Sequence, residues 1–96
     1  VLKYKDLEVS PSRGTLSGSN KELELTKNEM LIFQHLLNNQ NRIVSRDELM
    51  TILWNNEEYI NDNALTVNIS RLRSKLEGFG YPDAIETRKG QGYILL

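Results

Sequence analysis

The sequence has no cysteine, only two prolines and one histidine, and no long hydrophobic run. The lack of cysteine excludes disulfides and thiolate metal sites, and it permits a reducing compartment without proving one. The apolar runs are only a few residues long, so we expect neither a transmembrane span nor a signal peptide. Because the chain starts at Val1 rather than at Met, we expect it to be part of a longer protein.

An excess of positive charge is also missing. The formal net charge is −1 and the pI is about 5.8, and both values argue against a generic polyanion binder. The distribution is more informative, because residues 61–96 carry five Lys or Arg against four Asp or Glu. These cations form two clusters, at residues 71–75 and 88–89. Two compact basic clusters on a nearly neutral domain favour a local contact with phosphates.

What is present is the composition of one ordinary domain. The 96 residues are 39% hydrophobic and 26% charged, which is typical of a globular chain with a single core. Residues 1–25 contain four brief apolar–polar alternations, VLKY, DLEV, GTLS and ELEL, which are separated by the turn-forming residues Pro11, Gly14 and Gly18. This pattern predicts an antiparallel sheet of three or four short strands.

Helical signals begin at residue 26. Residues 26–29 (TKNE) and 45–48 (SRDE) have the form of capping boxes, and apolar residues follow each of them at helical spacing. Between these helices, residues 43–44 are compatible with a single extended step. A third helix is predicted from Asp62, as its N-cap, to about Leu76.

Glycines mark the last part of the chain. Gly78 or Gly80 is expected to end the third helix. The segments IET and YILL, joined by RKGQG at residues 88–92, predict a closing β-hairpin. The sequence therefore predicts an α+β fold with the order strands, three helices, hairpin.

A helical wheel divides the third helix into a buried stripe and an exposed face. The stripe expected to face the core consists of Leu65, Ile69, Leu72 and Leu76. The opposite face consists of Asn63, Val67, Ser70, Arg71 and Ser74, with Asn68 and Lys75 on one flank and Arg73 on the other.

This exposed face has two interpretations. A solvated amphipathic helix is the default for a surface helix. However, no acid lies between Asp62 and Glu77, so Arg71 and Lys75 have no acidic partner one turn away within the helix. Val67 is apolar where a solvated helix would favour a charged residue. A major groove offers a guanine edge to Arg71 and a thymine methyl to Val67, and the sequence therefore favours a contact with nucleic acid.

The hairpin tip also has two interpretations. As a plain turn, it needs Gly90 and Gly92 for positive φ, and Arg88 and Lys89 only keep it hydrated. Alternatively, it is a cationic finger that reaches a narrow minor groove, where the negative potential is enhanced. In that case the hydroxyl and backbone N–H of Thr87 can hold a phosphate.

Together these segments resemble the winged-helix effector domain of OmpR/PhoB-type response regulators. LTKNE, IVSRDEL, a Trp at the end of the second helix, VNISRLRSKL and IETRKGQGY match that family's pattern in order and register. The resemblance covers residues 1–96 as a single domain. It implies a winged helix-turn-helix fold with a four-stranded antiparallel N-terminal sheet, three helices and a C-terminal β-hairpin wing. It also implies a receiver domain in the full-length protein, which is absent from this chain.

The resemblance further implies the partners. The third helix, at 63–76, would lie in the major groove of double-stranded DNA, and the wing, at 88–92, in the minor groove. A second copy would bind in tandem on a direct-repeat operator, and loop 55–61 matches a segment that in some members contacts RNA polymerase. Carried over by position, the residues that would face base edges or nearby phosphates are Val67, Asn68, Ser70 and Arg71. Phosphate-contacting positions match Trp54, Arg73 and Thr87, and Lys89 matches the wing-tip residue that enters the minor groove. The other residues that we expect to bind DNA, on the same helix and the wing, are Asn63, Ser74, Lys75, Arg88 and Gly90.

Four positions depart from the residues common in that family. They are Asn63 (often Arg), Thr66 (often Asp), Asn68 (often His) and Arg88 (often Val). One cation is lost at the start of the helix and one is gained at the wing, which shifts phosphate contacts between the two elements. These departures prevent the transfer of any known operator sequence.

The remaining features have plainer interpretations. His35 has no second ligand at metal-binding spacing, so we expect no metal and no cofactor. Trp54 is expected to be mostly core, with a phosphate contact from its indole N–H as the lesser alternative. No catalytic set is recognisable, so we expect no enzyme. We expect the protein to be cytoplasmic. One alternative function stays open, a winged-helix protein–protein module that buries Val67 against a partner.

Overall fold

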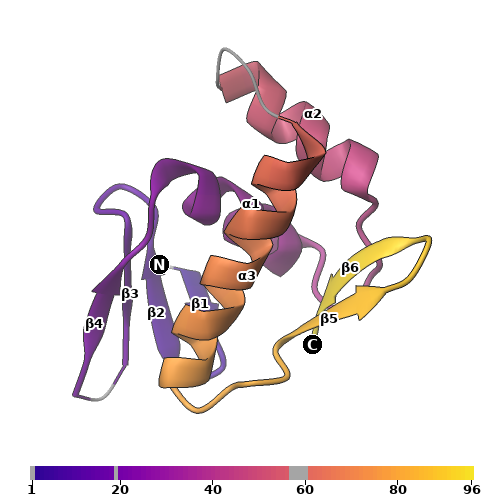
Figure 1. The fold of residues 1–96 in the computed structure, drawn as a ribbon. Helices are drawn as coiled ribbons and strands as arrows, with labels where there is room; N and C mark the ends of the chain where they lie inside the picture. The colour runs from indigo at the N-terminus through magenta and orange to yellow at the C-terminus, as the bar shows by residue number, and fades with distance from the viewer. Residues whose placement is uncertain (1, 19, 57–60) are drawn as a thin grey trace.

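A computed structural model describes residues 2–18, 20–56 and 61–96 (Figure 1). The predicted α+β winged-helix architecture is confirmed. The elements in chain order are β1 (Leu2–Tyr4), β2 (Leu7–Ser10), β3 (Thr15–Ser17), β4 (Glu22–Glu24), α1 (Lys27–Asn38), α2 (Arg46–Asn56), α3 (Asp62–Gly78), β5 (Ile85–Arg88) and β6 (Gly92–Leu95).

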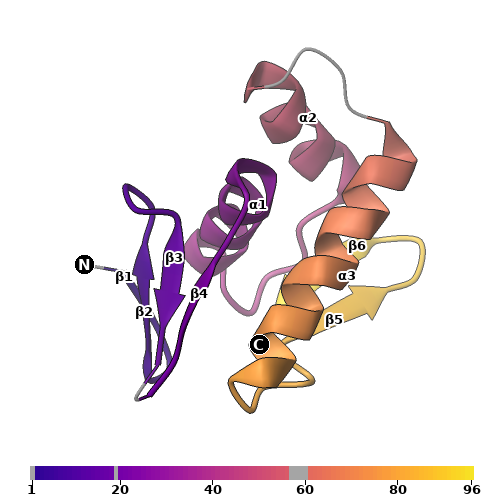
Figure 2. The same cartoon turned by 60° about the vertical axis from the view of Figure 1, so that its left-hand side comes forward.

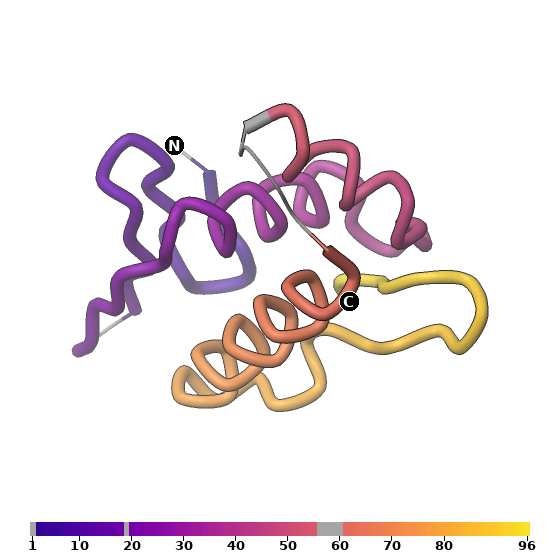
Figure 3. Tube along the Cα trace, turned by 45° about the horizontal axis from the view of Figure 1, so that its top comes forward, coloured from indigo at the N-terminus to yellow at the C-terminus, as the bar shows by residue number. Residues whose placement is uncertain are grey.

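The N-terminal strands form an antiparallel meander in the order β1-β2-β3-β4. Val9 pairs with Leu16, and Leu16 pairs with Leu23, so these three side chains share one face of the sheet. Val9 and Leu16 are buried. Figure 2 shows α1 between this sheet and α3, so the inner face of the sheet packs toward the helices. The sheet and the β5–β6 hairpin lie at opposite ends of the molecule (Figure 3).

The first capping box is confirmed, and the second is confirmed in half. Thr26 Oγ1 accepts from Glu29 N at 3.2 Å, and Glu29 Oε1 accepts from Thr26 N at 2.9 Å. At the start of α2, Ser45 Oγ accepts from Glu48 N at 3.1 Å. The Glu48 carboxylate contacts His35 instead of turning back to Ser45. The prediction of a reciprocal capping box was wrong at this position, because a basic partner on α1 competes for the carboxylate.

His35 lies in the last turn of α1 and pairs through Nε2 with Glu48 Oε2. Arg42 adds a longer contact to the same carboxylate at 3.5 Å. The hydrogen bond from His35, followed by the charges of His35 and Arg42, lowers the pKa of Glu48 from its usual value.

In the described part of the chain, no helix is long and apolar enough to cross a bilayer.

The chain between α1 and α2 adds a third, very short strand to the hairpin. Val44 N donates to Tyr93 O at 2.8 Å, and Tyr93 N donates to Val44 O at 2.9 Å. This isolated antiparallel bridge confirms the extended step predicted at residues 43–44. Gly92 has φ +144°, and a Cβ there would lie 2.0 Å from Val44 O. Only glycine therefore allows the two backbones to approach this closely.

Candidate nucleic-acid interface

Helix α3 presents the two faces that the helical wheel predicts. Every residue of the expected apolar stripe is at most 2% exposed: Leu65, Ile69, Leu72 and Leu76. Every residue of the opposite face is exposed: Asn63, Val67, Ser70, Arg71 and Ser74. Val67 is 38% exposed although it is apolar. The side chains expected to meet a ligand therefore lie on the surface.

The N-terminus of α3 differs from the prediction by one residue. Asn61, rather than Asp62, is the N-cap, and its Oδ1 accepts from Ala64 N at 2.8 Å. Asp62 is the first residue of the helix and pairs with Arg46 at 3.6 Å. Asn and Asp are both good caps, so propensity alone cannot choose between adjacent candidates.

Asn68 does not lie on the exposed flank where it was expected. It is 8% exposed, and its Nδ2 donates to Ala64 O at 2.8 Å. That bond satisfies the amide within the helix. Asn68 therefore does not belong to the exposed surface of α3.

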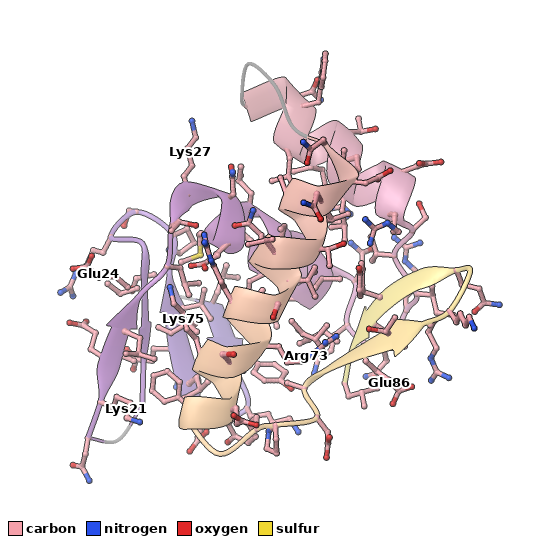
Figure 4. The ribbon with its side chains drawn as sticks, in the orientation of Figure 1. Lys21, Glu24, Lys27, Arg73, Lys75 and Glu86 are labelled. Carbon is pink, nitrogen blue, oxygen red and sulfur yellow. The ribbon has the colours of Figure 1, made fainter. Side chains whose placement is uncertain are left out.

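Lys75 also departs from the prediction, because it is engaged by the body of the domain. Its Nζ lies 2.6 Å from Glu29 Oε1 and 2.8 Å from Glu24 O. Glu29 is 1% exposed. In Figure 4, Lys75 extends from α3 toward the N-terminal sheet, away from the side on which Arg73 reaches the hairpin. The helix contains no partner for Lys75, but α1 supplies one, which local spacing could not reveal.

Arg73 links α3 to the hairpin. Its Nε donates to Ile85 O at 3.2 Å, and its Nη2 donates to Thr87 Oγ1 at 3.0 Å. The structure thus brings together two residues that were expected separately as phosphate contacts, Arg73 and Thr87. Both belong to one hydrogen-bonded unit in the free domain.

The hairpin turn is built as predicted. Gln91 N donates to Arg88 O at 2.8 Å and closes a turn over residues 88–91. Gly90 has φ +76°, a conformation that favours glycine. Arg88 is paired with Glu86 at 2.8 Å, on the same face of β5. Lys89 is exposed at the tip, and among the described residues no ion pair involves it.

Sequence reasoning missed Arg46, which holds the interface together. Its Nη1 donates to the Tyr93 hydroxyl, and its Nη2 donates to Asp62 O at 2.9 Å and to Thr66 Oγ1 at 3.2 Å. Arg46 therefore joins the start of α2, the start of α3 and the hairpin. These positions are far apart in the sequence, and no motif links them.

An open cleft of about 430 Å³ separates the start of α2 from the hairpin. Three cations face it, together with one acid and the backbone of the α2 N-terminus, which favours anions. A strand of phosphates fits such a cleft better than an uncharged ligand does. The lining residues are Ser45, Arg46, Asp47, Thr87, Arg88, Lys89, Gly90, Gln91, Gly92 and Tyr93.

Trp54 is 55% exposed, so the expectation that it is mostly core was wrong. It lies near the end of α2, beside Asp47, Met50 and Thr51 in a shallow depression. The apolar stripe of α2 is filled by Leu49 and Leu53 instead, which are fully buried. The predicted loop 55–61 begins too early, because α2 extends through Asn56, and its last residue, Asn61, is the N-cap of α3. Residues 57–60 lie outside the described residues.

Comparisons with known proteins agree with this geometry. A family model described as transcriptional regulatory protein, C terminal, matches residues 20–95. The chain is 43% identical over 94 residues to the response regulator protein GraR of Staphylococcus epidermidis, an alignment that covers 98% of this chain and 42% of GraR. The chain thus spans about two fifths of that relative's length.

Solved structures share the fold along the whole domain. The C-terminal domain of the nisin resistance regulator NsrR, a lantibiotic response regulator, superposes with a TM-score of 0.86 at 36% identity, covering 99% of this chain and 96% of that one. The DNA-binding domain of the response regulator AdeR, solved in complex with an intercistronic region, gives a TM-score of 0.82 at 25% identity, covering 97% and 95%. With the fold, the family match and these relatives in agreement, the chain belongs to the family of transcriptional regulatory protein C-terminal domains and is a winged-helix DNA-binding domain of the OmpR/PhoB response-regulator type.

Proposed function

We propose that this domain binds specific double-stranded DNA sequences with α3 in the major groove and the β5–β6 hairpin, the wing, in the adjacent minor groove. The observation that carries the proposal is the pairing of an exposed helix face with an exposed cationic tip. Val67 and Arg71 project from α3, and Lys89 projects from the wing. The AdeR domain, which has the same fold, was solved in complex with an intercistronic region.

Val67 and Arg71 lie four residues apart, which is about 6 Å along a helix axis. That separation is comparable with two base-pair steps of about 3.4 Å. Arg71 donates to the O6 and N7 of a guanine in this proposal, and Val67 packs on the methyl of a nearby thymine. A half-site should therefore contain a guanine and a thymine within about two base pairs of each other.

The surrounding residues hold the DNA backbone. Thr87, Arg88 and the N-terminus of α2 contact phosphates across the cleft, and Lys89 with Gly90 enters the minor groove. The remaining proposed contacts, to base edges or nearby phosphates, come from Asn63, Ser70, Ser74 and Trp54. The buried Asn68 and the ion-paired Lys75 are left out because neither side chain is free to meet DNA.

Salt dependence tests the proposal. Binding to a site selected from random DNA should weaken with salt with a log–log slope of about −0.9 for each neutralised phosphate. Lys89→Ala should weaken binding on all sequences and flatten that slope by about one unit. An unchanged slope would remove the wing from the interface. Binding to a protein partner with little salt dependence, and no DNA binding, would instead support a winged-helix protein–protein module.

We also propose that two copies bind in tandem on a direct repeat. Copies on one face of the duplex would need half-sites about 10–11 bp apart, one helical turn. Inserting 5 bp between the half-sites should abolish cooperative binding, and inserting a full turn should restore part of it. A lone half-site bound at full affinity would contradict the tandem arrangement.

In the whole protein, we propose that a receiver domain precedes this one and that the protein acts in the cytoplasm, where its DNA target is located. The support is the relative GraR, named a response regulator, of which this chain covers 42%. Segment 55–61, which begins with the last two residues of α2, is the proposed contact for RNA polymerase. Transcription by purified polymerase with a variant of Asn55 should fall while DNA affinity holds, and unchanged transcription would argue against this role.

A further inference from the structure

One guanidinium ties the exposed helix to the strand that leads to the wing tip. Arg73 is partly exposed, and two of its donors are used by β5, at Ile85 O and Thr87 Oγ1. The Ile85 acceptor is a backbone carbonyl at the strand edge, and the Thr87 acceptor is a side-chain hydroxyl on a strand face two residues further on. The planar fork of an arginine matches two such acceptors better than a lysine, which is a single point charge.

The pairing of β5 with β6 explains why an acceptor is available there. Leu96 N donates to Ala84 O at 2.9 Å, and the next pair along the ladder is Ile85 with Leu95. Hydrogen-bonded and non-hydrogen-bonded pairs alternate in an antiparallel ladder. The carbonyl of Ile85 therefore points away from β6, and Arg73 occupies the position that a further strand would take.

We infer that Arg73 is a positioning residue, which fixes the wing relative to α3 and orients the Thr87 hydroxyl, rather than an independent phosphate contact. Thr87 Oγ1 accepts from Arg73, so its own proton is left to donate outward, toward the cleft that Thr87 lines. The inference rests on the proposed function, because a wing whose separation from α3 is set in advance loses less conformational freedom when the two elements enter adjacent grooves.

A double-mutant cycle between Arg73 and Lys89 tests this inference. Arg73→Lys keeps the charge but loses the fork. In the wild-type background we expect it to weaken binding to the selected site on the order of tenfold, in the range typical of coupled residues. In the Lys89→Ala background, where the wing-tip contact that depends on this positioning is already lost, the same change should cost at least about threefold less. A cycle of Arg71→Ala with Lys89→Ala is the matched control and should be nearly additive.

A measurement without DNA separates positioning from contact. In the free domain, Arg73→Lys should lower the backbone order parameters of residues 88–91 from about 0.85 to below about 0.6, while the α3 backbone stays rigid. Unchanged wing order, together with additive loss in the cycle, would overturn the inference and make Arg73 a phosphate contact. If the wild-type domain shows no salt-dependent DNA binding, the proposed function fails, and the order parameters still decide whether Arg73 holds the wing.

Discussion

Replacing Lys75 by Met separates a structural lysine from a DNA-binding one. The change keeps most of the aliphatic stem and removes the ammonium. Glu29, which is 1% exposed, then loses the cation that lies 2.6 Å away. Its other oxygen, Oε2, is already buried without a hydrogen-bond partner. A further hydrogen bond to this carboxylate comes from Thr26 N at 2.9 Å, but a neutral amide cannot neutralise a buried charge.

The expected loss of stability follows from the cost of breaking a buried ion pair, which is about 3–5 kcal/mol. The side chain of Lys75 is 28% exposed, so in the variant water can partly solvate the Glu29 carboxylate in place of the ammonium. We therefore expect a loss at the lower end of this range, about 3 kcal/mol. For a domain of this size, each kcal/mol lowers Tm by about 4–8 °C, so Tm should fall by about 12–24 °C. The double variant Lys75→Met with Glu29→Gln removes the uncompensated charge and should recover more than about half of the loss.

Thermal and urea unfolding followed by circular dichroism measure this loss, and DNA affinity is measured at a temperature where each variant is folded. We expect the affinity of Lys75→Met to stay within about twofold, because the Lys75 charge is already compensated by Glu29 and screened from the DNA. A stability loss below about 1 kcal/mol combined with a tenfold loss of affinity would refute the assignment. Lys75 would then be a DNA contact, as predicted from the sequence.

Two further predictions concern the frame of the interface. Gly92→Ala should destabilise the domain by at least about 2 kcal/mol, because a Cβ at this position would clash with Val44 O. Gly90→Ala should cost only about 1–2 kcal/mol for its positive φ, because nothing lies within 4 Å of a Cβ there. Equal Tm values for the two variants would contradict the clash. Glu48 has a folded pKa below its usual value of 4.5, so its stabilising contribution is complete above that value and is lost as the pH falls through the folded pKa. Urea unfolding between pH 7 and pH 3 should show a weaker acid dependence in Glu48→Gln than in the wild type, and identical profiles would disprove the link to His35.

The periodic features of the fold were predictable from the sequence because each of them is local. Apolar spacing at 3.6 residues placed the buried stripe of α3, and alternation with turn residues placed the strands. The same spacing gave the exposure of Val67 and Arg71. The match to the family pattern then supplied the roles that spacing alone leaves open.

Features that depend on distant partners were not predictable. The position of Lys75 on a helical wheel does not reveal that it pairs with the buried carboxylate of Glu29 on α1. Likewise, the wheel does not reveal that Asn68 donates a hydrogen bond to the backbone carbonyl of Ala64. No role was predicted for Arg46, which joins α2, α3 and the hairpin, and Trp54, which was expected to be mostly core, is 55% exposed. A single sequence carries no record of tertiary contacts of this kind.

The proposal that Arg71 reads a guanine is tested most directly with base analogues. The affinities of the wild type and of Arg71→Ala are compared on the selected site and on the same site with 7-deazaguanine at each guanine in turn. Arg71→Ala should cost roughly 1–3 kcal/mol, and at one guanine the analogue should weaken the wild type but leave Arg71→Ala unaffected. If every analogue weakens both proteins equally, and Arg71→Ala loses the same affinity on unrelated DNA, then α3 does not read bases through Arg71.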